Sequence, residues 1–103
     1  MVLYIIRIFN NEESFIKIGI TKKTVFQRCS ELRRIGYNIE IIHELEMNMF
    51  DAFNTEQSLL MEVDNFSYIP HYKFNGMSEC IIDSDITIDI INKLLENINA
   101  YQN

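Results

Sequence analysis

The sequence has few of the residues that build disulfide scaffolds, sharp turns or membrane spans. It contains two cysteines, three glycines, one proline and no tryptophan among 103 residues. Two cysteines are too few for a disulfide framework, and the long separation of Cys29 and Cys80 matches no paired metal-ligand spacing. We therefore expect both to be reduced thiols in the core.

Long apolar segments are also missing. There is no run of about 18 apolar residues, which excludes a membrane-spanning helix. The opening apolar stretch contains Arg7 and is followed by no site that resembles a signal cleavage site. The expected location is the cytoplasm, with no association with a membrane.

Several enzyme motifs are absent as well. The sequence has no glycine-rich phosphate loop, no histidine pair at zinc-binding spacing and no serine in a nucleophile elbow. These absences exclude the usual nucleotide-binding, zinc and serine-hydrolase sites.

Positive charge is scarce overall but concentrated in one segment. The formal net charge is -6 and the pI is about 4.8, which is the wrong sign for holding DNA through the charge of the whole protein. Within residues 17–34, however, Glu31 is the only acid, and six bases occur: Lys17, Lys22, Lys23, Arg28, Arg33 and Arg34. The last third of the chain is acidic and would repel a phosphate backbone. Any nucleic acid is therefore expected to bind on one side of the protein.

Apolar and aromatic residues are abundant. Hydrophobic residues make up 48% of the chain and aromatic residues 12%, which is the composition of a folded protein. A chain of this length suits one domain, residues 1–103, with one core.

The hydrophobic pattern predicts alternating strands and helices. Residues Val2–Phe9 and Phe15–Ile20 are strand-like and are separated by a polar turn, so they are expected to form an antiparallel hairpin. In chain order, the further elements expected are a helix Thr21–Arg34, a strand Tyr37–Met47, a helix from Asn48 or Asp51 to about Asp64, a well-anchored loop Asn65–Ser78, a short strand Glu79–Ile82 and a last helix 84–100. The predicted class is α/β, with a small, three-stranded, mainly antiparallel sheet flanked by helices, plus a C-terminal helix.

Four residues of these elements stand in a distinctive order. Tyr4 lies in the first strand, Lys17-Ile18-Gly19 in the second, Arg28 in the first helix and Glu56 in the second. This order resembles the GIY-YIG nucleases, in which a strand with Gly-Ile-Tyr pairs with a strand with Tyr-Ile-Gly, and two helices then present an arginine and a metal-binding glutamate.

The resemblance covers residues 2–82 and has a phage-type character. The stretch Lys17–Thr21, followed by Arg28 and Leu32, looks like the phage branch of the family, in which lysine commonly replaces the second tyrosine. The first motif lacks its glycine, the second lacks its tyrosine, and Asn75 is the better candidate for the asparagine that closes the family pattern. The resemblance implies a nuclease with Tyr4, Lys17, Arg28 and Glu56 as catalytic residues and Glu56 as the ligand of Mg²⁺ or Mn²⁺.

The chemistry of these residue types agrees with that implication. Phosphodiester hydrolysis needs an activated water and positive charge at the phosphate, and one carboxylate suffices for Mg²⁺ when phosphate supplies further ligands. Arg28 can present two parallel donors to phosphate, and Tyr4 can orient or deprotonate the attacking water. Lys17 can assist that step or steady the phosphate if its pKa is lowered by neighbouring Arg28 and the metal. The alternatives are a solvated Glu56, a surface Arg28 and an ordinary core Tyr4.

A second set of residues is expected to contact DNA without doing chemistry. Gly19 would let the DNA backbone approach the sheet, although a simple bulge also explains a glycine there. The other members are Lys22, Lys23, Arg33, Arg34 and Asn75. For the basic residues, plain solubility is the competing explanation.

Two histidines have weaker connections to the chemistry. His43 can be either a second proton carrier or a hydrogen-bonded core histidine, and the second interpretation is favoured. His71, near Tyr68 and Tyr72, can stack on DNA, but a packed aromatic loop is the simpler account.

The sequence therefore leads to one main hypothesis and one alternative. The main hypothesis is a metal-dependent endonuclease that cuts DNA in the cytoplasm, the host's cytoplasm if the chain is phage-encoded. The alternative is a GIY-YIG-like module that no longer cuts and binds protein or nucleic acid, as a phage-encoded modulator would. The last helix offers its apolar face either to its own core or to a second copy of the chain.

Overall fold

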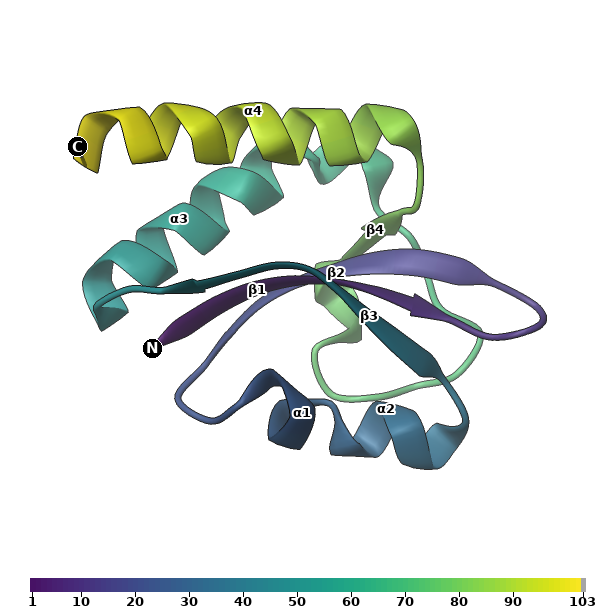
Figure 1. The fold of residues 1–103 in the computed structure, drawn as a ribbon. Coiled ribbons are helices and arrows are strands. Elements are labelled where there is room, and N and C mark those ends of the chain that lie inside the picture. Colours follow the sequence, from purple (N-terminus) through teal and green to yellow (C-terminus); the bar gives the residue numbers. More distant parts are fainter. Residues whose placement is uncertain (103) are drawn as a thin grey trace.

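The computed structural model describes the backbone of residues 1–102 and the side chains of residues 1–98. Its centre is an antiparallel sheet with strand order β3-β1-β2-β4 (Figure 1). The strands are β1 (Val2–Phe9), β2 (Ser14–Thr21), β3 (Asn38–Glu46) and β4 (Cys80–Ile82). The predicted α/β class is confirmed, and the short strand expected at residues 79–82 joins the sheet as its fourth strand.

The β1–β2 hairpin forms because both strands alternate apolar faces and a polar turn joins them. Asn10 Oδ1 accepts hydrogen bonds from the backbone N–H groups of Glu12 and Glu13, which closes the turn. The resulting register sets Tyr4 directly opposite Gly19. This pairing places the two motif strands side by side.

The helix expected over Thr21–Arg34 is two shorter helices, α1 (Val25–Arg28) and α2 (Ser30–Ile35). Thr24 begins α1 with a capping box, in which its side chain accepts from the N–H of Gln27 and the Gln27 side chain accepts from the N–H of Thr24. Cys29 then leaves helical geometry, with φ −93° and ψ 10°. Apolar spacing alone did not reveal this break, because Val25, Cys29 and Leu32 still reach the same core.

Helices α3 (Met49–Glu62) and α4 (Asp85–Gln102) cover the opposite face of the sheet (Figure 1). Leu59 of α3 and Ile91 and Leu95 of α4 are buried against the apolar side chains of β1 and β2 on that face. The apolar face of the last helix is thus used within the chain. Among residues 1–102, no helix combines the length and the apolar character that crossing a membrane requires.

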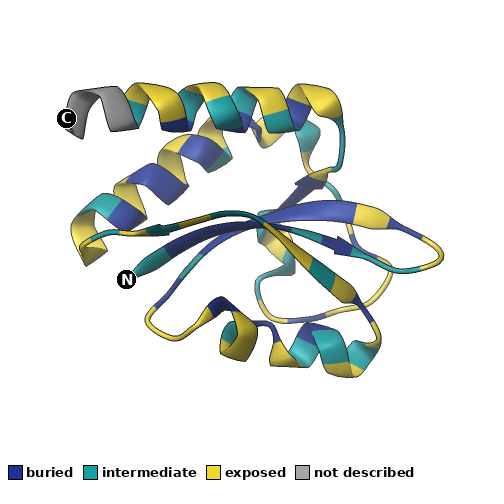
Figure 2. Ribbon diagram, viewed as in Figure 1, coloured by how far each residue is buried: buried dark blue, intermediate teal, exposed yellow. Residues whose placement is uncertain are grey.

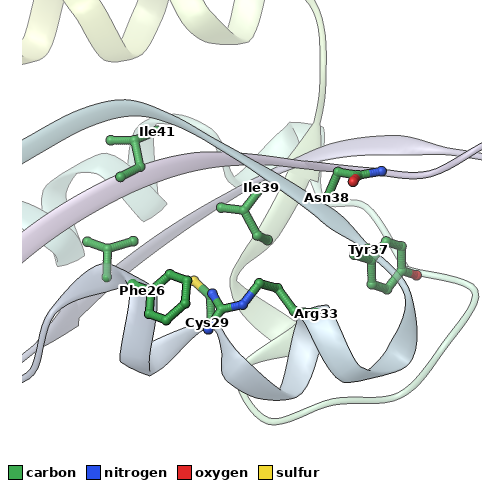
Figure 3. A pocket seen from close by; sticks show the side chains of 8 residues that line it. Phe26, Cys29, Arg33, Tyr37, Asn38, Ile39 and Ile41 are labelled. Atoms are coloured by element: carbon green, nitrogen blue, oxygen red, sulfur yellow. The ribbon is translucent and has the colours of Figure 1, made fainter.

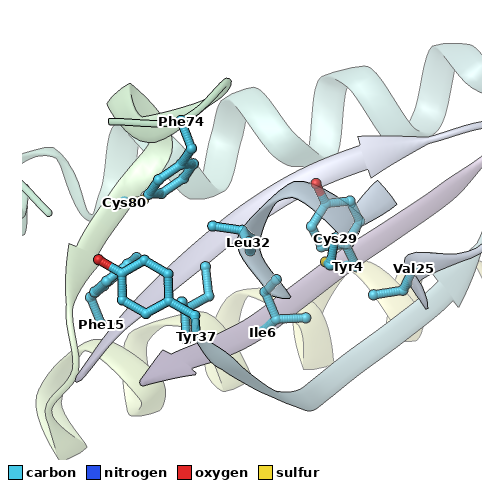
Figure 4. Close-up of a cluster of buried hydrophobic side chains, with 10 residues drawn as sticks. Tyr4, Ile6, Phe15, Val25, Cys29, Leu32, Tyr37, Phe74 and Cys80 are labelled. Carbon is cyan, nitrogen blue, oxygen red and sulfur yellow. The ribbon is translucent and has the colours of Figure 1, made fainter. Parts of the chain in front are cut away.

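The sheet therefore separates two cores, one of buried side chains on each of its faces (Figure 2). The core on the α1–α2 side also contains residues from the connection between α3 and β4, which includes the 3₁₀ turns η1 (Asp64–Phe66) and η2 (Met77–Glu79). Its buried members are Tyr4, Ile6, Ile8, Phe15, Val25, Cys29, Leu32, Tyr37, Phe74 and Cys80 (Figure 4). Both cysteines are buried and reduced, as expected.

The connection between α3 and β4 is held to the sheet by one buried carboxylate. Glu13 accepts hydrogen bonds from the hydroxyls of Tyr37 and Tyr68 and from the backbone N–H of His71. The N–H of Tyr68 also donates to the carbonyl oxygen of Cys80 at 3.0 Å. The expectation of a well-anchored loop is confirmed, but the anchor itself, Glu13, was not predicted.

Candidate active site

Tyr4 and Lys17 meet on the α1–α2 face of the sheet. Both side chains are buried, and Lys17 Nζ donates to Tyr4 Oη at 3.1 Å. The two residues come from adjacent strands and project to the same side because of the hairpin register. Two of the predicted catalytic residues are therefore in direct contact.

Gly19 makes room for the Tyr4 ring. A Cβ atom built on Gly19 would lie 2.4 Å from Tyr4 Oη and 2.5 Å from its Cζ, distances that no side chain can occupy. Gly19 is itself buried. The structure thus gives this glycine a role that the sequence did not indicate, since it makes room for a buried tyrosine, and its expected contact with DNA stays a prediction.

Replacing Gly19 with alanine is expected to destabilise the protein by about 1–3 kcal/mol, the usual cost of forcing extra volume into a packed site. The added methyl would displace Tyr4 and break its contact with Lys17. Urea unfolding followed by circular dichroism measures the change. The control is the same substitution in a Tyr4→Ala background, because the nearest atoms that the added methyl meets all belong to the Tyr4 ring and the extra cost of Gly19→Ala should disappear without it. Equal stability of Gly19→Ala and the wild type would contradict the assignment.

Lys17 is a buried cation with two partners. Besides Tyr4, its Nζ contacts Glu79 Oε2 at 3.2 Å. The side chain of Lys17 is 2% exposed. Burial acts to lower the pKa of Lys17, but Tyr4 and Glu79 outweigh it, so that the pKa lies above its usual value. The protein side chains alone therefore do not meet the condition set for proton transfer by Lys17, a lowered pKa, because the neighbours that dominate are an anion and a phenol. Lys17 acts as a fixed positive charge.

Arg28 brings a second cation to the same place. It is the last residue of α1 and is partly buried. A Cβ built on Gly76 would lie 3.1 Å from Lys17 Nζ and 3.6 Å from Arg28 Nη2, so both charged groups flank the backbone of Gly76. Gly76 has φ 83°, which favours glycine at this turn. Asn75 precedes it and is exposed, which puts this predicted residue at the rim of the site.

Glu56 comes from the helix layer on the other face of the sheet. It lies on α3 and is 6% exposed. Burial and the charge of Glu79 raise its pKa, while the Gln57 amide and the charge of Lys17 oppose this shift. Its carboxylate accepts from Gln57 Nε2 at 3.3 Å and forms no salt bridge with any residue among the described side chains.

Glu79 is the residue of this site that sequence reasoning missed. It was counted only among the acids of the last third, yet it pairs with Lys17 and influences Glu56. The available signal was its position three residues after Gly76, just before a short strand. The structure therefore gathers Tyr4, Lys17, Arg28 and Glu79 in one cluster, and Glu56 on α3 lies near enough for Lys17 and Glu79 to influence its pKa.

Comparison with known families agrees with a phage-type module. The model of the T5orf172 domain matches residues 1–98. The chain belongs to the T5orf172 domain family. Domains of this family occur in some phage and nuclease-like proteins, and they are associated with nuclease-like or DNA-binding modules. No curated protein and no solved structure matches the chain significantly.

The T5orf172 domain carries its predicted DNA-contacting bases beside this site. Lys22, Lys23 and Arg34 are exposed, and Arg33 is partly buried with its guanidinium 3.7 Å from the centroid of the Phe26 ring. Within residues 1–98, neither these four nor Arg28 forms a salt bridge. Unpaired cations in an acidic protein make this the surface that attracts an anion.

Neither histidine of the T5orf172 domain belongs to the site. His43 Nε2 lies 2.6 Å from Asn92 Oδ1 of α4, on the face of the sheet opposite Tyr4. The expected hydrogen bond is confirmed, although His43 is half-buried and belongs to neither core, and its place on the opposite face separates it from Tyr4. The His71 ring instead lies 3.5 Å from the Glu12 carboxylate.

Proposed function

We propose that this T5orf172 domain is a GIY-YIG-type endonuclease that hydrolyses DNA phosphodiester bonds with a divalent metal ion. One observation carries the proposal: Lys17 and Arg28 converge on Gly76, while the buried Glu56 lies within the electrostatic influence of both Lys17 and Glu79. A cationic pair beside a buried carboxylate without a salt-bridge partner suits a phosphate and a metal ion together. A structural core has no need for this combination.

The donor set fits Mg²⁺ or Mn²⁺ and disfavours a soft metal. Glu56 supplies hard carboxylate oxygens, and its raised pKa reflects burial and the nearby charge of Glu79, which Gln57 and Lys17 offset only in part. No group of three metal-binding side chains occurs within the part of the chain described by the structure. Glu56 would therefore hold the ion together with water and substrate phosphate. A bound Mg²⁺ supplies positive charge to a phosphate oxygen and to the leaving oxygen.

Each protein side chain has a distinct task in this proposal. Arg28 binds the scissile phosphate through its guanidinium, and Lys17 adds a second fixed charge beside it. Glu79 keeps Lys17 protonated and oriented, as its 3.2 Å contact requires. Tyr4, fixed by Lys17 at 3.1 Å and by the absence of a side chain at Gly19, orients or deprotonates the attacking water.

The binding contacts complete the proposal. Lys22, Lys23, Arg33 and Arg34 would follow the DNA backbone, with Asn75 at the opposite rim. One site cuts one strand, so cutting both strands requires two copies of the chain. DNA is the proposed partner, and sequence preference would come from loops or from another module.

A non-cutting binding module is the second candidate, and the net charge of -6 favours it. The two candidates differ in what purified protein does to DNA. Incubation of supercoiled plasmid at low salt with Mg²⁺ or Mn²⁺ is expected to give nicked and then linear DNA, and a chelator should stop the reaction.

Arg28→Ala, purified in the same way, is expected to cut about a hundredfold more slowly, the usual effect of removing one donor to a developing charge. This variant also controls for contaminating nuclease. Folded wild-type protein that shifts DNA without cutting it, in either metal, would favour the binding module. Equal cutting by the variant would remove Arg28 from the site.

A further inference from the structure

A hollow lies between the α1–α2 pair and the edge strand β3, and its lining includes none of the proposed catalytic residues (Figure 3). Its volume is about 290 Å³. That is close to the lower limit of small-molecule pockets, roughly 300 Å³, and suits one flat ring system better than a peptide. Its main lining residues are Val25, Phe26, Cys29, Arg33, Ile39 and Ile41.

The rim of this hollow exposes an aromatic ring. Phe26 is 71% exposed and belongs to neither core, and Ile41 across the hollow is 49% exposed. The Arg33 guanidinium lies over the Phe26 ring, 3.7 Å from its centroid (Figure 3). An exposed phenylalanine contributes little to folding, whereas a phenylalanine paired with an arginine is a common platform for a nucleobase.

Cationic side chains connect this platform to the catalytic site. Phe26 and Arg33 also border a shallow depression with Lys23, and Lys23 in turn borders one with Arg28 and Arg34. The surface is therefore continuous around α1 and α2, from Arg28 at the active site to the apolar hollow. Across residues 1–98, these basic side chains have no salt-bridge partners, although the chain as a whole is acidic.

We infer that the hollow receives an unpaired base of the DNA substrate. The base stacks on Phe26 beside Arg33 while the neighbouring phosphates lie along Lys23, Arg34 and Arg28. A base inside a duplex is already stacked and cannot enter, so the inference names DNA with an unpaired or extruded nucleotide as the preferred ligand. It rests on the proposed function for the DNA itself, and its new content is the base site.

The test compares two DNA duplexes by fluorescence anisotropy, with a chelator present so that no cutting occurs. One is perfectly paired, and the other has the same sequence with a single-nucleotide bulge. The wild type is expected to bind the bulged duplex about tenfold more tightly, and Phe26→Ala to lose this preference while its affinity for the paired duplex is unchanged. Phe50→Ala is the matched control, because Phe50 is 75% exposed on α3, outside the hollow.

Equal affinity of the wild type for the two duplexes would overturn the base site but leave the nuclease proposal standing. An equal loss of affinity for both duplexes in Phe26→Ala would also overturn it, and circular dichroism would then show whether the variant had unfolded. Absence of binding to either duplex would overturn both proposals. This is also the result expected if the hollow holds a protein segment instead of a base.

Discussion

Replacing Glu56 with glutamine is expected to slow metal-dependent DNA cleavage by at least about 10³-fold. Glutamine has nearly the same shape but carries no charge, so the proposed metal ion loses its protein anchor. The charge that a metal gives to a reacting phosphate lowers the barrier by several kcal/mol, and each 1.36 kcal/mol is a factor of ten. The plasmid assay, followed over time at saturating Mg²⁺, measures the rate.

The same substitution should not harm folding. Glu56 is 6% exposed and has a raised pKa, which shows that burial of its charge is costly in the folded protein. We therefore expect the stability of Glu56→Gln to equal or exceed that of the wild type in urea unfolding.

The matched control is Glu62→Gln, on the same helix but exposed, which should cut at the wild-type rate. Full cutting activity in Glu56→Gln would exclude Glu56 as the metal ligand. Lost activity together with lost stability would indicate a structural role instead.

Replacing Glu13 with alanine is expected to destabilise the folded protein by about 3–5 kcal/mol. The substitution removes the acceptor of two tyrosine hydroxyls, those of Tyr37 and Tyr68, and of the backbone N–H of His71. Hydrogen bonds to a charged group contribute about 1.5–3 kcal/mol each. The buried Tyr37 hydroxyl would lose its partner without access to water, whereas the part-buried donors of Tyr68 and His71 can turn to water and lose less. Domains of this kind are stable by only about 5–15 kcal/mol, so much of the fold's stability would be lost.

The pH dependence of stability has a definite sign at Glu13. Burial acts to raise the pKa of Glu13, but the hydrogen bonds from Tyr37, Tyr68 and His71 outweigh it and lower the pKa below 4.5. A lowered pKa in the folded state means that the contribution is fully present above the unfolded pKa and disappears as the pH falls through the folded value. Asp83, whose pKa is also lowered, adds to the same acid-side loss.

Urea unfolding at pH 7 and at several values below 4.5 measures both effects. Glu13→Ala should be less stable at pH 7 and should lose less of its stability on acidification than the wild type. Glu12→Ala, an exposed neighbour in the same turn, is the control and should behave like the wild type. An identical acid dependence in Glu13→Ala and the wild type would contradict this account.

The strands and the motif positions could be predicted because their signals are local. Alternation of apolar side chains identified β1 and β2 to within one or two residues, and the polar turn between them predicted the hairpin. Once the hairpin was predicted, Tyr4 and Lys17 had to lie on neighbouring strands. The α1–α2 pair was predicted less well, since a single break at Cys29 leaves the apolar spacing almost unchanged.

The contacts of the site could not be predicted in the same way. Glu79 and Lys17 are separated by 62 residues, and Glu13 and Tyr68 by 55, so no window of sequence contains both members of either pair. Gly19 was considered as a point where DNA approaches the sheet, but its contact with Tyr4 could not be predicted, because the space above a glycine depends on the strand beside it. The raised pKa of Lys17 could not be predicted either, since only folding brings Glu79 next to it.

By itself, then, the sequence determined the order of strands and helices, the basic segment and the candidate residues Tyr4, Lys17, Arg28 and Glu56. The order of elements and the basic segment follow from periodicity, capping and residue chemistry, which act over a few residues, whereas the four candidate residues were selected by their resemblance to the GIY-YIG pattern. The tertiary structure alone decided that Lys17 is a paired cation, that Gly19 makes room for Tyr4, that Glu13 anchors a loop and that Phe26 borders a hollow. Electrostatic and packing energies depend on distance in space, and only folding brings residues so far apart in the chain within that distance.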